Sequence, residues 1–332
     1  MKELYSIYHP QLPQFLRELS VCPSMERLKH LGMNCGCEYT RLPEYQDLPP
    51  YSRWQHSLGV GLIVWHFTGN RAQATAGLLH DIATPTFAHV VDFLHGDHMR
   101  QESTEQGTAE IISADAMLVQ SLAKYGLHPA QVEDYHDYPI ADNDAPRLSA
   151  DRLEYTMGNA VNFGFATAEE MRILYQDLRV GTNELGQPEL VFQSPDCAKR
   201  FAELSLQCSY VYIADANRLA MELLAQLLRE AIQDGSLQES DLHSTEEAVI
   251  AKLKRSGKFA ARWEKFCSLC GVRISEQKID GACYQIPSKK RWIDPLIQNC
   301  GRTSEQFPAY RHSLQEYFEH SLRSWLSPVE KT

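Results

Sequence analysis

The stretch Gly77-Leu78-Leu79-His80-Asp81 ends an apolar, small-residue run with an imidazole and a carboxylate. The segment Arg53-Trp54-Gln55-His56-Ser57-Leu58-Gly59 carries a second histidine, 24 positions before His80. Burying a carboxylate costs free energy unless an opposite charge compensates it. Imidazole nitrogen together with carboxylate oxygen is typical of a divalent-metal site. Asp151, in the run 150–155, can supply a further acid. The pattern therefore predicts a metal site built on helices.

Local signals place helices on both sides of these residues. Ser52-x-x-Gln55 has the spacing of a capping box, and apolar residues recur at helical intervals from Trp54 to Trp65. The alanine-rich run 71–81 is also typical of a helix. Further elements are expected as helices over 87–94, 103–125, 148–161, 167–178, 197–232, 241–255 and 304–325, a small β-hairpin over 181–192, and an irregular stretch over 265–300.

Three segments are predicted along the chain. Residues 1–50 are rich in proline and are expected to wrap over the body as an N-terminal segment. Residues 51–180 would form the core with the metal site. Residues 181–332 would form the hairpin and a C-terminal helical region packed on that core.

Charge and composition narrow the classes of partner. The chain has 43 acidic and 32 basic residues and a net charge of −11, which argues against a general nucleic-acid surface. A negative body can still hold a local basic pocket for a small phosphate. The start of the sequence lacks the pattern of a signal peptide, and no apolar run approaches the ~20 residues that span a bilayer. We therefore expect a cytoplasmic protein without a membrane partner.

The nine cysteines are scattered, so a disulfide framework is not expected in a chain of this length. Two readings remain open for the cysteines at 267, 270, 283 and 300. Cys267 and Cys270 have the spacing of half a zinc site, but Cys283 and Cys300 are not closely spaced. Ordinary reduced thiols are the favoured reading.

The motifs resemble those of a known superfamily. The residues that occur in the ligand order of the HD-domain metal-dependent phosphohydrolases are His56, His80, Asp81 and Asp151. Residues 53–60 resemble the R-F-E-H-S-L-G-V segment of the deoxynucleoside triphosphate triphosphohydrolase branch. Residues 78–89 resemble its L-L-H-D-I-G-H-x-P-F-S-H, residues 103–107 its T-H-E-Q-G, and residues 151–155 its D-K-x-D-Y. These similarities cover about residues 50–230.

The resemblance implies an all-α fold, an HD-domain helical bundle with a small β-hairpin and additional C-terminal helices. It implies one divalent metal ion (Mn, Mg, Fe, Ni or Zn) held by His56, His80, Asp81 and Asp151. The residues expected to bind substrate are Arg53, Arg152, Tyr155 and Tyr212. The expected catalytic residues are His89 and Asp92, with Asp92 orienting the attacking water or a neighbouring imidazole.

Several positions depart from the pattern of the branch. Thr84 and Thr104 stand where the branch has histidines, and Asn159 stands where it has an acid. The histidines normally serve in acid/base steps, and such help contributes ~10²–10⁴ in rate. We therefore expect fewer acid/base residues around the metal than in the branch. His95 and His98 of the adjacent loop are hypothetical catalytic replacements.

The expected function is a metal-dependent phosphohydrolase acting on a nucleotide or a similar small phosphate ester or anhydride. The alternative is a regulatory HD protein that binds metal and nucleotide with little or no turnover. The expected partner is the small phosphorylated substrate, and a homo-oligomer is compatible with the resemblance. Near the end of the chain, residues 288–296 resemble a K-x-R-x-[IV]-D-P element. This element is either a basic surface turn or a segment that folds back over the pocket and brings Lys289 and Arg291 to it.

Overall fold

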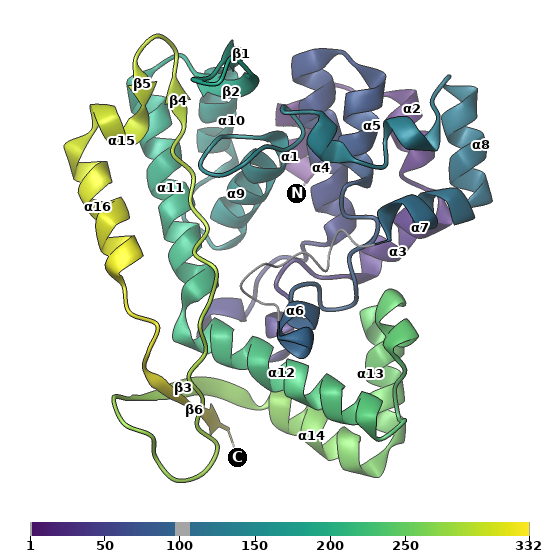
Figure 1. Cartoon of the computed structure of the whole chain (residues 1–332), viewed down its shortest axis with the longest axis vertical. Helices are drawn as coiled ribbons and strands as arrows, with labels where there is room; N and C mark the ends of the chain where they lie inside the picture. Colours follow the sequence, from purple (N-terminus) through teal and green to yellow (C-terminus); the bar gives the residue numbers. More distant parts are fainter. Residues whose placement is uncertain (1, 97–106, 332) are drawn as a thin grey trace.

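The computed structural model describes residues 2–96 and 107–331, and it is mostly helical (Figure 1). Its α-helices are α1 (Lys2–Tyr8), α2 (Gln14–Leu19), α3 (Pro23–Arg27), α4 (Arg53–Thr68), α5 (Arg71–Leu79), α6 (Val90–His95), α7 (Thr108–Ala114), α8 (Ala116–Lys124), α9 (Ala150–Asn162), α10 (Ala168–Gln176), α11 (Pro195–Ile213), α12 (Asp215–Gln233), α13 (Glu246–Arg255), α14 (Gly257–Cys267), α15 (Thr303–Gln306) and α16 (Pro308–Glu319). Its strands are β1 (Leu178–Thr182), β2 (Pro188–Phe192), β3 (Leu269–Ser275), β4 (Leu296–Ile297), β5 (Gly301–Arg302) and β6 (Trp325–Glu330). None of the helices in these described ranges has the length and apolar character that a membrane span needs.

The helices α4 and α5 pack closely and carry the first part of the site. Ser52 caps α4 with the expected capping box, in which its side chain accepts the Gln55 N–H and the Gln55 side chain accepts the Ser52 N–H. Small residues line the contact: a Cβ built at Gly77 would lie 3.1 Å from Val64 Cγ2. Because the helices approach so closely, His56 in α4 and His80, just past the end of α5, come side by side.

Two small sheets lie at opposite ends of the molecule (Figure 1). The predicted hairpin is present as the antiparallel pair β1–β2, and β4 adds parallel to β2, followed by β5 antiparallel to β4. At the other end, β3 pairs antiparallel with the C-terminal strand β6. The connection from β3 to β4 runs the length of the molecule between these sheets (Figure 1).

Two of the predicted long helices are each broken into two. The 103–125 prediction is wrong within its described part, because the chain is extended at Asp115, whose carboxylate accepts the Leu118 N–H and the Ser24 N–H. The 197–232 helix breaks at Ala214 (ψ 143°). There, Asn217 and Arg218 donate side-chain hydrogen bonds to carbonyls at the end of α11. In both cases side-chain contacts replace backbone bonds of a continuous helix.

The C-terminal prediction also needs correction. The 304–325 segment breaks at Phe307, before Pro308 begins α16, and the helix ends at Glu319. The stretch 265–300, expected to be irregular, contains β3, which the short, half-exposed pattern did not reveal. The pairing of β3 with β6 spans more than 50 residues, so no local signal marks it.

The apolar core is shared among the three predicted segments. One large cluster runs from Leu4 to Ile297 and includes side chains of α4, α5, α9 and α11. A second runs from Cys35 to Leu326 and centres on α12, α13 and α14. Both clusters contain residues from 1–50, 51–180 and 181–332, and the division at residues 50 and 180 stays a prediction.

Candidate metal centre

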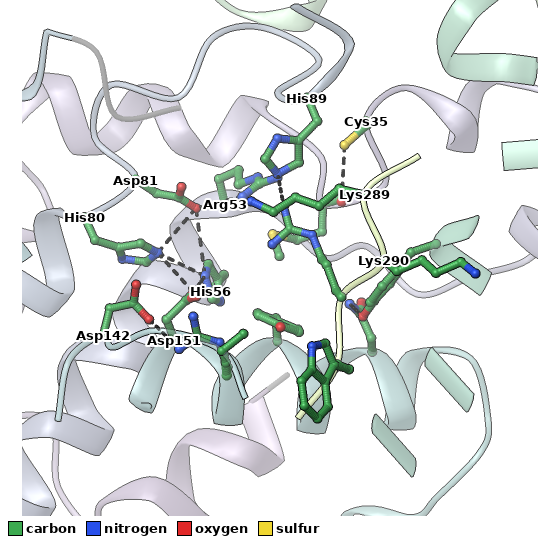
Figure 2. Close-up of a pocket in the computed structure, with 18 of the residues that line it drawn as sticks. Cys35, Arg53, His56, His80, Asp81, His89, Asp142, Asp151, Lys289 and Lys290 are labelled. Carbon is green, nitrogen blue, oxygen red and sulfur yellow. Dashed lines mark hydrogen bonds and ion pairs between the residues drawn. The ribbon is translucent and has the colours of Figure 1, made fainter. Parts of the chain in front are cut away.

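Three predicted ligand atoms converge at one point. His56 Nε2 lies 3.1 Å from His80 Nε2 and 3.0 Å from Asp151 Oδ1, and His80 Nε2 lies 3.5 Å from the same oxygen. Two ligands about 2.1 Å from one ion, at angles near 90–109°, are separated by about 3.0–3.4 Å. Among the described residues, His56, His80 and Asp151 are the His, Cys, Asp and Glu side chains whose ligand atoms lie close enough together to hold an ion. These residues therefore fit a single metal ion (Figure 2).

The second nitrogen of each imidazole has its own partner. His56 Nδ1 lies 2.6 Å from Glu154 Oε2, and His80 Nδ1 lies 2.8 Å from the Gly77 carbonyl oxygen. These oxygens accept the Nδ1 protons, so each Nε2 is the nitrogen that would present a lone pair to a bound ion. Two lone pairs and a carboxylate oxygen then face one another, an arrangement that a cation stabilises.

The charge around His56 also favours a cation. Burial lowers the pKa of this imidazole, but hydrogen bonds and charges from Asp151 and Glu154 outweigh it and raise the pKa to about 10. The electrostatic potential at His56 Nε2 is therefore strongly negative.

Asp81 faces the same point from slightly further away. Its Oδ2 lies 3.7 Å from His80 Nε2 and 3.9 Å from His56 Nε2, and it accepts a 3.0 Å bond from Arg53 Nη1. Burial raises the pKa of Asp81, but Arg53 and the two imidazoles hold it well below its usual range. The hydroxyl of Thr84, in place of the histidine of the branch, donates to Asp81 Oδ1 at 2.8 Å. Thr84 thus supports a predicted ligand instead of supplying an acid or base.

The convergent atoms lie in the wall of a cavity of about 740 Å³ (Figure 2). The four predicted metal ligands, the four predicted substrate-binding residues and His89 all line it, and so do Lys289 and Arg291. The element at 288–296 therefore folds back over the pocket, as one of the two open readings held.

The predicted substrate-binding residues are each engaged with neighbours. Arg53 pairs with Asp81, as described above. Arg152 Nη1 donates to Asp142 Oδ1 at 2.9 Å, and the rings of Tyr155 and Tyr212 lie 6.4 Å apart. Their roles in substrate binding stay predictions.

His89 and Asp92 form a pair at the start of α6. Asp92 is buried and its Oδ2 lies 2.9 Å from His89 Nδ1, while His89 Nε2 lies 3.2 Å from Arg291 Nη2. Burial is the largest effect on the His89 pKa and, with Arg291 and Arg53, lowers it to about 4. Asp92 thus orients an imidazole, and His89 is neutral in this structure.

The structure does not bring His95 to the predicted metal ligands, and its catalytic role stays a prediction. His95 does not line the cavity; its imidazole lies half-exposed, 3.7 Å from Glu239 Oε1. It is the last residue of α6, and its distance from the cavity lining gives it no contact with the predicted ligands in this structure. His98 and Thr104 lie outside the described residues.

Sequence reasoning missed two carboxylates beside the site. Glu154 is buried against His56, and its place three residues after Asp151 on α9 was the signal that could have found it. Asp142 lines the cavity from a loop and binds Arg152, and no pattern in the sequence points to it. The cysteines that could have held a zinc ion are free thiols, and no cluster of cysteine ligands occurs within the described ranges.

Comparisons with known proteins found similar sequences and a similar solved structure. No family model matches the chain. The chain is 26% identical over 257 residues to the uncharacterized protein YdhJ of Bacillus subtilis (strain 168), covering 74% of each chain. It is 26% identical over 224 residues to the metal-dependent phosphohydrolase cns2 of Cordyceps militaris, covering 62% of this chain and 60% of that protein.

A solved phosphohydrolase structure from Bacteroides thetaiotaomicron matches 97% of both chains, with a TM-score of 0.62 and 14% identity. The predicted helical fold class is thereby confirmed. At the general level, these similarities are to proteins described as phosphohydrolases, one of them metal-dependent, and they support a hydrolase enzyme. Membership of the deoxynucleoside triphosphate branch stays a prediction.

Proposed function

We propose that the protein is a metal-dependent phosphohydrolase whose substrate is a nucleotide or a similar small phosphate ester or anhydride. The observation that carries this proposal is the convergence of two imidazole nitrogens and a carboxylate oxygen within 3.0–3.5 Å, in the wall of a cavity lined by cationic side chains. His56, His80 and Asp151 would hold the ion, with Asp81 as the fourth ligand. When bound, the ion would polarise a phosphate oxygen and lower the pKa of a bound water.

The remaining residues have roles that follow from their contacts. Glu154 keeps the proton of His56 on Nδ1 and so keeps Nε2 turned to the ion. Arg53 holds Asp81 in its ionised form. Asp92 fixes the ring of His89, which lines the cavity and is a candidate for proton transfer.

A nucleotide fits the polar and aromatic groups on the other side of the cavity. Tyr155 and Tyr212 offer ring surface, and Asn159 donates its amide N–H to the Tyr212 hydroxyl at 2.7 Å. The buried Asn159 Oδ1 has no hydrogen-bond partner among the described residues. Buried acceptors are normally paired, so this atom favours a substrate that presents a donor, such as a sugar hydroxyl.

The test combines metal content with a substrate panel. Purified wild-type protein, Asp151→Asn and the control Asp196→Asn, an exposed carboxylate in the first turn of α11, would be assayed for bound metal. Release of phosphate, pyrophosphate or triphosphate from nucleotides and simple phosphoesters would be measured with Mn, Mg, Co, Ni and Fe. We expect Asp151→Asn to lose both bound metal and at least ~10²-fold in turnover, and Asp196→Asn to keep both.

A second candidate, a regulatory protein that binds metal and nucleotide without turnover, is favoured by two contacts. Thr84 stands in place of a histidine and its hydroxyl is committed to Asp81, while His89 Nε2 is engaged by Arg291. Metal and nucleotide binding without any product, under all the metals tested, would reject the hydrolase proposal in favour of this candidate.

A further inference from the structure

A basic segment from late in the chain lines the cavity opposite the metal ligands. We call residues Ser288–Trp292 the basic strap, because they include Lys289, Lys290 and Arg291. The strap belongs to the long connection between β3 and β4 (Figure 1). It therefore reaches the site from an element remote in sequence from every predicted ligand.

Contacts on its outer side hold the strap in place. Lys290 Nζ donates to three carbonyl oxygens at the end of α16, those of Tyr317, Phe318 and His320, at 2.8, 2.6 and 2.8 Å. Further along, Asp294 accepts two bonds from the first turn of α15, at 2.9 and 2.6 Å. Because side chains of an extended segment alternate in direction, anchoring Lys290 outward turns its two neighbours to the cavity. Figure 2 shows Lys289 directed toward His89 and Lys290 directed away from it.

Arg291 donates to the imidazole of His89. A guanidinium has no acceptor, so the 3.2 Å contact with His89 Nε2 requires a lone pair on that nitrogen. The ring proton is then on Nδ1, where it is donated to Asp92 at 2.9 Å. Both ring nitrogens of His89 therefore have hydrogen-bond partners, and the bond from Arg291 prevents Nε2 from accepting a proton.

The charged and titratable groups around His89 come from four elements. Asp92 belongs to α6, Arg291 and Lys289 to the basic strap and Arg53 to α4, and the thiol of Cys35 lies against the His89 backbone N–H. Burial lowers the His89 pKa most, and the two guanidiniums lower it further against the opposing effect of Asp92. In this arrangement His89 does not take up a proton near neutral pH.

Building on the proposed function, we propose that a substrate phosphate group binds the basic strap and takes Arg291 away from His89, so that phosphate binding itself frees His89 Nε2. A guanidinium–phosphate pair has an ionised donor and an ionised acceptor and is frequently bidentate, whereas the imidazole offers one neutral acceptor. The exchange of imidazole for phosphate is therefore favourable for Arg291. The incoming negative charge also favours a protonated imidazole. Arg291 is thus a positioning residue that keeps His89 neutral until a phosphate group is in place.

The test uses the full chain with ¹⁵N-labelled histidine, in the presence of Mg²⁺, and inorganic phosphate as the probe. The imidazole nitrogen shifts of His89 are followed from pH 5 to 8 with and without saturating phosphate. We expect His89 to stay neutral with its proton on Nδ1 in the absence of phosphate, and its pKa to rise by about one unit or more when phosphate is bound. This measurement needs no variant and no turnover.

Variants then test the role of Arg291. Arg291→Gln should weaken phosphate binding about tenfold or more and should raise the pKa of His89 in the phosphate-free protein. Arg291→Lys keeps the positive charge but loses the planar guanidinium that binds phosphate through two bonds. Its phosphate affinity and its His89 pKa should fall between those of wild type and Arg291→Gln. The control is Arg273→Gln, which removes an exposed arginine of β3 outside the cavity lining and should match wild type.

The outcomes separate this inference from the proposed function. If phosphate leaves the His89 shifts of the wild type unchanged, or if Arg291→Gln binds phosphate as tightly as Arg273→Gln, the inference is overturned even when the protein hydrolyses phosphoesters. If phosphate shifts His89 but no substrate is turned over, the strap is an anion site and the hydrolase proposal fails instead.

Discussion

The carboxylate of Glu154 connects the metal centre to the core. It is fully buried, and it accepts hydrogen bonds from His56 Nδ1 and from the hydroxyls of Tyr51 and Tyr8. Partners of this kind fix the tautomer and orientation of a ligating imidazole. Glu154 therefore contributes to metal binding without reaching the ion.

Replacing Glu154 with Gln should reduce metal affinity ~10–100-fold, because the amide no longer supplies the negative charge that holds the His56 proton on Nδ1. Competition titration against a chromogenic chelator measures this directly. Glu169→Gln, which changes an exposed acid on α10, serves as the control. Equal affinities for the two variants would show that the Glu154 contact is only structural.

Among the elements, the crossing of α4 and α9 depends on a residue without a side chain. A Cβ built at Gly59 would lie 2.6 Å from both Cγ and Oε1 of Glu154. Gly in a helix interior normally costs about 1 kcal/mol relative to Ala. Here glycine is needed, because it lets α9 bring Glu154 against His56.

Gly59→Ala should therefore destabilise the protein by about 1–3 kcal/mol, the usual cost of overpacking, and should also weaken metal binding. The control is Gly257→Ala at the start of α14, where an added Cβ meets nothing within 4 Å and stability should stay level or rise. Urea unfolding of both variants measures whether each one lowers or raises the free energy of unfolding. A more stable Gly59→Ala protein would contradict the close approach of the two helices.

The first turn of α13 holds a buried acid against the N-terminal segment. Glu246 accepts the Gly32 backbone N–H at 2.8 Å and the Tyr39 hydroxyl at 2.7 Å, close to the half-buried Glu38. Burial, with the charge of Glu38, raises the pKa of Glu246 to about 8. The folded state thus favours the protonated carboxyl.

The raised pKa of Glu246 makes the protein less stable as the pH rises. The stability contributed by Glu246 is fully present below its unfolded-state pKa, near 4.5, and is lost as the pH rises through about 8. We expect the free energy of unfolding to fall between pH 5 and pH 8, and Glu246→Gln to flatten that fall. Urea unfolding at both pH values measures it, with Glu247→Gln, the exposed neighbour, as control. Parallel pH profiles for Glu246→Gln and wild type would contradict the shared buried site.

At the scale of the whole molecule, one arginine joins distant parts of the chain. Arg302 makes two bonds to the buried Glu189, at 2.6 and 2.9 Å, and donates to the carbonyl of Asp294. Glu189 also accepts the Leu148 backbone N–H at 3.1 Å. The hairpin, the strand β5 and the segment before α9 are thus fixed to one another.

Arg302→Met should destabilise the protein by about 3–5 kcal/mol, because it leaves Glu189 charged and buried without its partner. The double variant Glu189→Gln/Arg302→Met should cost less than the sum of the single changes, since Glu189 then no longer leaves a buried charge without its partner. Thermal or urea unfolding of the three variants gives the coupling. Additive effects would mean that the two residues do not depend on each other.

Much of the fold could be read from local signals. The start of α4 at Ser52, the alanine-rich α5 and the β1–β2 hairpin depend on residues within a few positions of one another, and the sequence predicts all three. The helical periodicity of the sequence did not show the breaks at Asp115 and Ala214, where the side chains of Asp115 and Asn217 bond backbone groups that a continuous helix would pair.

For the site, the order of residues along the chain was enough to identify the side chains chemically able to hold a metal: His56, His80, Asp81 and Asp151. The groups that surround these side chains depend on how the helices pack. The tertiary fold buried Glu154 against His56, placed His95 away from the cavity, and brought Arg291 to His89 from about 200 residues away. The physical reason is that helix caps and periodicity act within one or two turns, whereas burial, charge and hydrogen-bond partners depend on which elements the hydrophobic core packs together.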